Sequence, residues 1–198
     1  MKTTRRILLV LVALAATVLP ASGQSGPQVV VTMSVAGTIQ DQGGAYYIAF
    51  AVGQSLLAGP QPDSTNWTHY VLYRGGRFLF GTVPPADIQQ FAFLRIRPPA
   101  PFLYGQVLPN RKTLRVSVPL GDLEVGPGQV RRFMVNFVTT DDANKPLHAL
   151  GMGATDRFGF VTVELGKDIY VTVPAPRGGP SPDPNFTIAG GNIQIMAP

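Results

Sequence analysis

Residues able to carry out acid–base or nucleophilic chemistry are scarce in this sequence. It has two histidines, His69 and His148, no cysteine and no Gly-x-Ser-x-Gly segment. A hydrolytic triad needs a histidine beside an activated serine, which that glycine-flanked turn would present. The lack of cysteine excludes thiol catalysis, cysteine-bound zinc and structural disulfides. We therefore predict that the chain is not an enzyme, and we expect both histidines on the surface or in packing.

The acidic residues are few and dispersed. A glycosidase needs two carboxyl groups facing each other roughly 5 to 9 Å apart. Glu124 and Glu164 are the only glutamates, and nothing in the sequence pairs Glu164 with an aspartate. Asp141 and Asp142, followed by Asn144, are the weak candidates for a metal site built from oxygen ligands. They lack the Asp-x-Asn-x-Asp-Gly spacing of a calcium loop. We expect a turn with solvated acids there, and we predict neither a metal nor another cofactor.

Aromatic residues are concentrated between positions 46 and 80. Rings exposed on a β-sheet can stack on sugar rings or other flat ligands, so this stretch supplies candidate ligand-binding residues. The candidates are Tyr47, Trp67, Tyr70 and Tyr73. Both alternating faces of the strands predicted here carry aromatic residues, so at least one set must belong to a hydrophobic core. Core packing is therefore the favoured interpretation, and a stacking surface is the alternative.

Helix signals are almost absent after residue 23. Short runs of β-branched and aromatic residues are separated by glycine, proline and asparagine, which is typical of a sandwich or barrel. The predicted strands span residues 29–38, 45–52, 67–73, 77–83, 88–97, 102–108, 113–120, 133–140, 158–165 and 169–173. The pattern predicts an all-β antiparallel sandwich of about eight to ten strands, immunoglobulin-like or jelly-roll-like.

Two hairpins are predicted from turn residues. Gly75-Gly76 can adopt the positive φ angles of a two-residue turn between strands 67–73 and 77–83. The second hairpin would join strands 158–165 and 169–173 across Gly166, Lys167 and Asp168. In the strand at 113–120, apolar and polar residues alternate, which predicts one buried face and one exposed face.

Residues 1–23 have the order of a secretory signal peptide. Lys2, Arg5 and Arg6 precede an apolar run of 13 residues, and small residues precede a cleavage position after Gly23. A helix that crosses a bilayer needs about 20 apolar residues, so this run is too short for an anchor. We predict a cleaved signal peptide and a bacterial protein that is secreted, periplasmic or on the cell surface. No later segment is apolar and long enough to span a membrane.

The 175 residues that follow suit one domain. The predicted sandwich occupies residues 24–173. Five prolines lie between positions 174 and 184, which favours a stiff loop or linker at the start of segment 174–198. Residues 186–196 are either a final strand, interrupted by Gly190-Gly191, or a loose tail.

The net charge of +5 reflects the leading segment more than the domain. Three of the 16 basic residues and none of the 11 acidic residues lie in positions 1–23, so the remainder carries +2. This is not the basic footprint of a nucleic-acid-binding protein. We expect a glycan or another surface protein as partner, and no nucleic acid.

Three segments resemble those of uncharacterised secreted bacterial proteins of the DOMON-like and carbohydrate-binding-module-like sandwich group. They are residues 45–50 leading to Gly59-Pro60, residues 67–78, and residues 113–123 running into 133–141. The resemblance implies an extracellular β-sandwich whose relatives bind sugars, haem or Ca²⁺. Residues 51–57 lack the acidic side chains that similar proteins carry in that loop, so no functional residue is carried over.

Together these features predict a non-catalytic secreted or cell-surface binding module. The alternative is a carbohydrate- or small-ligand-binding domain that uses the aromatic residues of its strands.

Overall fold

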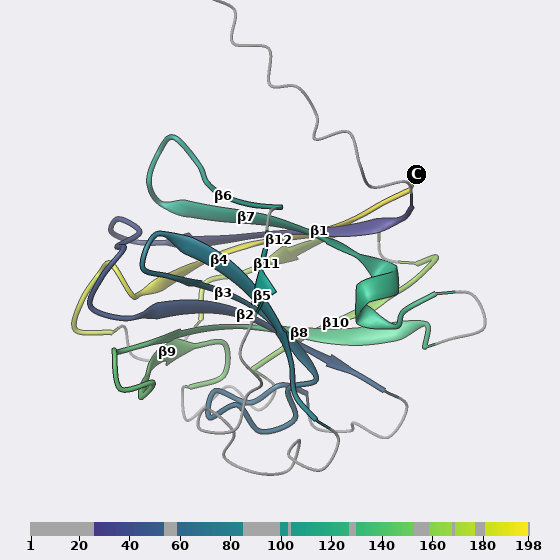
Figure 1. The fold of residues 1–198 in the computed structure, drawn as a ribbon, viewed down its shortest axis with the longest axis horizontal. Helices are drawn as coiled ribbons and strands as arrows, with labels where there is room; N and C mark the ends of the chain where they lie inside the picture. Colours follow the sequence, from purple (N-terminus) through teal and green to yellow (C-terminus); the bar gives the residue numbers. More distant parts are fainter. Residues whose placement is uncertain are drawn as a thin grey trace, which may run out of the picture.

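The computed structural model describes residues 26–53, 59–84, 100–102, 104–126, 130–152, 159–167, 169–176 and 181–197. Two antiparallel sheets pack face to face (Figure 1), which confirms the predicted all-β sandwich. Residues 1–23, which are predicted as a signal peptide, and the strand predicted at 88–97 lie outside the described residues. Within the described ranges, no helix is long and apolar enough to cross a membrane.

The five-stranded sheet, sheet A, is centred on the first strand. Its order is β11 (Tyr170–Val173), β12 (Ile188–Met196), β1 (Gln28–Val35), β7 (Thr113–Pro119) and β6 (Gly105–Val107). A short 3-10 helix, Leu120–Leu123, follows β7.

The seven-stranded sheet, sheet B, has a longer path. Its order is β10 (Val161–Glu164), β8 (Arg132–Thr140), β2 (Ala45–Val52), β3 (His69–Arg74), β4 (Arg77–Thr82) and β5 (Ala100–Pro101), and β9 (Pro146–Ala149) also pairs with β8. β9 and β10 share one edge of β8 at different heights. The described residues thus form twelve strands, more than the predicted eight to ten. The short strand β9 accounts for part of the difference.

The core between the sheets follows from period-two patterning. In β7, Leu114, Val116 and Val118 are buried while Arg115 is exposed, because successive side chains of a strand point to opposite faces. The same alternation in β1 places Val29 and Val31 in the core.

Sheet B is buried on both of its faces, unlike sheet A. All but the last residue of β2 are buried, because a second hydrophobic cluster covers the outer face of this sheet. We call it the outer cluster; its buried members are Ala45, Tyr47, Ala49, Trp67, Tyr70, Leu72, Val83, Val138 and Ala149. Trp67 belongs to the loop that precedes β3, so this loop covers part of the outer face of sheet B.

The first predicted hairpin is confirmed and the second is wrong. Gly75 and Gly76 have φ angles of 60° and 74° and join β3 to β4 with Arg74 opposite Arg77. By contrast, β10 pairs with β8 in sheet B, and β11 pairs with β12 in sheet A. The connection after Gly166 therefore carries the chain from sheet B to sheet A.

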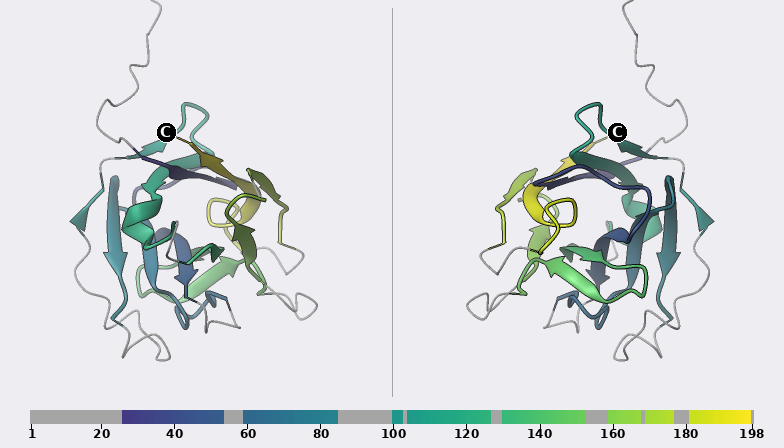
Figure 2. Two further views of the ribbon diagram at one scale, coloured as in Figure 1. Left: turned by 90° about the vertical axis from the view of Figure 1, so that its right-hand side faces the viewer. Right: turned by 90° about the vertical axis from the view of Figure 1, so that its left-hand side faces the viewer.

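The C-terminal segment belongs to the sandwich. β12 lies between β1 and β11, with Gln28 opposite Met196 (Figure 2). The strand alternative for residues 186–196 is therefore the one observed, and the domain boundary predicted at residue 173 is corrected to include β12. A Cβ on Gly191 would lie 2.0 Å from the carbonyl oxygen of Thr32, so the close approach of β1 requires glycine there.

Candidate functional site

The aromatic residues selected from the sequence are buried. Tyr47, Trp67, Tyr70 and Tyr73 expose at most 4% of their surface. The first three lie in the outer cluster with tilted ring contacts of 5.3 to 6.2 Å, and Tyr73 faces the core between the sheets. These four rings do not form an exposed stacking row, so the alternative of a ligand-stacking surface on these residues is corrected. Aromatic residues occur on both faces of these strands because sheet B is buried on both of its faces.

Polar atoms of the outer cluster are used in packing. The indole Nε1 of Trp67 donates to the carbonyl oxygen of Gln61 at 2.7 Å, and the Tyr47 hydroxyl donates to Oδ1 of Asn144 at 3.2 Å. Burial raises the pKa of the Tyr70 hydroxyl well above its usual range. Such hydroxyls stay protonated and are poor nucleophiles at neutral pH.

The loop that holds Asp141 and Asp142 is organised by hydrogen bonds that its own side chains accept. Oδ1 of Asp141 accepts the N–H of Lys145 at 2.8 Å, and Oδ1 of Asn144 accepts from Nη2 of Arg74 at 2.6 Å. In the part of the chain that the structure describes, no three histidine, aspartate or glutamate side chains gather as a metal site would require. The contacts are those of a turn.

Both histidines are buried on different elements. Nδ1 of His69 lies 3.0 Å from Oγ1 of Thr68, and its ring stacks on Phe80 at 6.0 Å. Burial lowers the pKa of His69, an effect that the charges of Glu124 and Asp122 partly oppose. Nδ1 of His148 accepts the backbone N–H of Ile188 at 2.9 Å. Both rings pack in the fold, as expected from the sequence.

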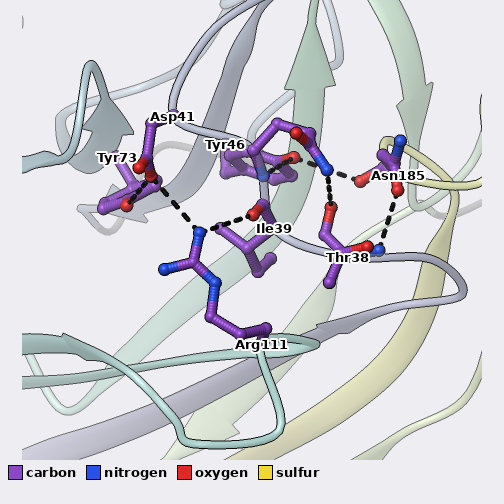
Figure 3. Close-up of polar contacts among 8 residues, drawn as sticks. Thr38, Ile39, Asp41, Tyr46, Tyr73, Arg111 and Asn185 are labelled. Carbon is purple, nitrogen blue, oxygen red and sulfur yellow. Dashed lines mark hydrogen bonds and ion pairs between the residues drawn. The ribbon is translucent and has the colours of Figure 1, made fainter.

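A polar network, which we call the end network, links the loop after β1 to the turn before β7 and to the C-terminal segment (Figure 3). Asp41, in the loop after β1, accepts a short hydrogen bond from the Tyr73 hydroxyl and lies 3.8 Å from Nη2 of Arg111. Arg111 sits in the turn before β7 and also donates to the carbonyl oxygen of Ile39 at 3.2 Å. Three separate chain segments are thereby held together.

Tyr46 extends this network to the C-terminal segment. Its hydroxyl accepts the N–H of Gln40 at 2.9 Å and donates to the carbonyl oxygen of Asn185 at 3.2 Å. Oδ1 of Asn185 accepts the N–H of Thr38 at 2.8 Å (Figure 3). Burial raises the pKa of Tyr46 and Tyr73 to about 12. The hydroxyls of protonated tyrosines therefore link loops of the sandwich, and the role of the network is structural.

The outward side of sheet A presents a different surface, which we call the polar face. The strand register places two neighbouring rows of side chains across its five strands. The first row is Tyr170, Gln194, Val30, Ser117 and Tyr104, and the second is Thr172, Asn192, Thr32, Arg115 and Gln106. Arg115 is the one charged residue in the two rows.

Most side chains of the polar face are accessible, whereas Val30, in the middle of the first row, is buried. Tyr170 is 59% exposed and Tyr104 is 37% exposed, and Gln194, Thr172 and Gln106 are exposed as well. Amide side chains offer both donors and acceptors, and hydroxyls do the same. Four strand spacings separate the two tyrosines, a distance of about 19 Å. The face can therefore contact an extended ligand through hydrogen bonds, with a ring near each end.

Local sequence patterns do not single out the polar face, because its residues come from five strands distant in the chain. The available signal is alternation within each strand. In β11 and β12, polar residues and Tyr170 alternate with apolar residues, which indicates that one face of these strands is exposed to solvent. The alternating residues are Tyr170, Thr172, Asn192 and Gln194. Their alignment into rows depends on strand order.

None of the family models, curated protein sequences or solved structures with which the chain was compared matches it.

Proposed function

We propose that the chain is an exported, non-catalytic binding domain whose polar face holds an uncharged, hydroxyl-rich ligand such as a glycan. The observation that carries the proposal is the alignment of amide and hydroxyl side chains in two rows on an exposed sheet, with Tyr170 at one margin. This keeps the binding function expected from the sequence and moves it away from the buried aromatic residues.

The rigidity of the face favours binding by hydrogen bonds. Its side chains stand on paired strands, so few backbone degrees of freedom need to be ordered when a ligand arrives. Two contacts already hold the surface: Asn192 donates its N–H to Oγ1 of Thr32 at 3.0 Å, and Ser117 shares a short bond with Gln28.

The composition of the face selects the ligand class. Amide and hydroxyl groups match the hydroxyl groups of sugars, and the exposed ring of Tyr170 can stack on a sugar ring. With Arg115 as the one charge in both rows, an anionic polymer would find little complementary charge. An uncharged glycan fits this surface better.

Export supports the same function. Residues 1–23 carry the basic, apolar and small-residue order of a signal peptide, and that order would place the domain where polysaccharides are abundant. The sequence resemblance to secreted sandwich proteins agrees with this location.

A glycan array followed by titration calorimetry tests the proposal. Gln194→Ala removes one amide from the face and should weaken binding about threefold to tenfold, the effect of one hydrogen bond. Asp142→Ala, in the exposed loop at the end of the sandwich, is the matched control and should bind like wild type. Failure to retain any glycan, or equal affinity of wild type and Gln194→Ala, would reject the polar face as the site.

A further inference from the structure

The open edge of sheet A is formed by β11, which among the described residues pairs with β12 and no other strand. Its flank is unusually exposed for apolar side chains: Ile169 is 70% exposed and Tyr170 is 59% exposed. Residues 169–173 carry no charge. An uncharged edge strand with high β-propensity is a template for pairing with another strand.

The hydrogen-bond pattern shows which backbone groups face outward. The N–H of Ile195 donates to the carbonyl oxygen of Ile169 at 2.9 Å, so residues 169, 171 and 173 direct their backbone groups toward β12. Because this direction alternates along an antiparallel strand, Tyr170 and Thr172 direct their N–H and C=O groups to the open edge. The edge thus offers two donors and two acceptors.

These four groups are self-complementary about Val171. If two copies of β11 pair antiparallel with the Val171 residues opposite each other, Tyr170 of each copy lies opposite Thr172 of the other. Each such pair exchanges two hydrogen bonds, so every outward backbone group of both strands is satisfied. Centring the pair on Thr172 instead would place Tyr170 opposite Pro174, which has no N–H to donate.

The side chains fit the same register. In an antiparallel pair, opposite residues lie on the same face of the sheet. Pairing about Val171 brings Ile169 beside Val173 on the inward face and Tyr170 beside Thr172 on the outward face. β-branched and aromatic pairs of this kind stabilise antiparallel sheets.

We infer that two copies of this chain associate through β11 and form one continuous ten-stranded sheet. A two-fold axis perpendicular to the sheet places the polar faces of both copies on the same side, with the two Tyr170 rings near the axis. Pairing of five residues buries less than the 1,200 to 2,000 Å², roughly, of a stable interface, so the dimer fraction rises with protein concentration. The association does not depend on the ligand proposed for the polar face.

Disulfide trapping tests the register directly, because the native chain has no cysteine. In Val171→Cys the two thiols face each other in a non-hydrogen-bonded pair with Cα atoms about 4.5 Å apart, within the range of a disulfide. Mild oxidation should convert most of this variant to a covalent dimer. Thr172→Cys is the control: Thr172 is the more exposed residue, but its two copies would lie more than about 7 Å apart.

Sedimentation velocity on the native sequence between about 1 µM and 1 mM should show a dimer fraction that grows with concentration. Thr172→Pro removes an outward N–H and leaves the bonds to β12 in place, so it should abolish the dimer, whereas Thr172→Ala should keep it. A native chain that remains monomeric throughout the series would overturn the inference. So would equal crosslinking of the two cysteine variants, or an edge that pairs with an unrelated peptide while the chain stays monomeric. Because Thr172 also belongs to the polar face, glycan binding is scored separately on the native sequence at a concentration at which it is monomeric, which distinguishes failure of the dimer from failure of the proposed function.

Discussion

Nδ1 of His148 accepts the backbone N–H of Ile188 at 2.9 Å, and this bond joins β9 of sheet B to β12 of sheet A. A backbone N–H can only donate, so the imidazole must present an unprotonated Nδ1. Nearby, Oγ1 of Thr139 lies 2.6 Å from the carbonyl oxygen of Phe186, to which it donates. Side chains of sheet B thus hold the last strand in the sandwich.

Replacing His148 tests that connection. His148→Leu removes the acceptor and leaves the buried N–H of Ile188 unpaired, which should lower the free energy of unfolding by about 1 to 3 kcal/mol. His148→Asn retains an acceptor at a similar distance from the backbone and should lose less. Urea unfolding followed by circular dichroism measures both variants; a leucine variant as stable as wild type would contradict the role of the bond.

The buried His69 predicts a loss of stability in acid. Burial lowers its pKa from the ordinary value of 6.5, so the unfolded chain binds this proton more readily than the folded one. The contribution of neutral His69 to the free energy of unfolding is therefore fully present above about pH 6.5. It decreases as the pH falls toward the pKa of His69 in the folded chain. His69→Gln removes the titrating group and should flatten this part of the curve of unfolding free energy against pH. An unchanged slope in that variant would assign the acid sensitivity to other groups.

Tyr46, in the end network, predicts a loss of stability in alkali, in addition to the loss in acid that His69 predicts. Burial raises the pKa of Tyr46 from 10.0 to about 12, so the folded chain retains a proton that the unfolded chain releases. Stability is therefore complete below about pH 10 and decreases as the pH rises toward 12. Tyr46→Phe should make this alkaline decrease shallower, as measured by denaturant unfolding at several pH values. The variant also loses two hydrogen bonds, so its stability at neutral pH serves as the reference.

Trp67 is expected to contribute stability rather than ligand affinity. Trp67→Ala empties the centre of the outer cluster and should cost about 3 to 5 kcal/mol of unfolding free energy. Trp67→Phe keeps most of the ring and loses the bond to Gln61, so it should cost less and still fold. A folded Trp67→Phe should retain glycan binding at the wild-type level; a loss of affinity would relocate the site to sheet B.

Local sequence patterns were sufficient for much of the fold. The alternation in β7 predicted which residues, Val116 and Val118 among them, enter the core. Gly75-Gly76 predicted a tight hairpin because only residues that tolerate positive φ build it. Both inferences depend only on the conformational preferences of a few neighbouring residues, and those preferences follow directly from the residue types.

Strand partners and two-sided burial were decided by the tertiary structure. The turn at Gly166 looks the same whether its flanking strands pair with each other or enter different sheets, because the choice depends on the open edges of β8 and β12. Buried aromatic residues of sheet B likewise look the same as an exposed stacking row until the loop with Trp67 is seen to cover them. Periodicity is a property of one strand, whereas burial and pairing depend on segments distant in the chain, so the polar face and the edge at Val171 emerge only when those segments are assembled.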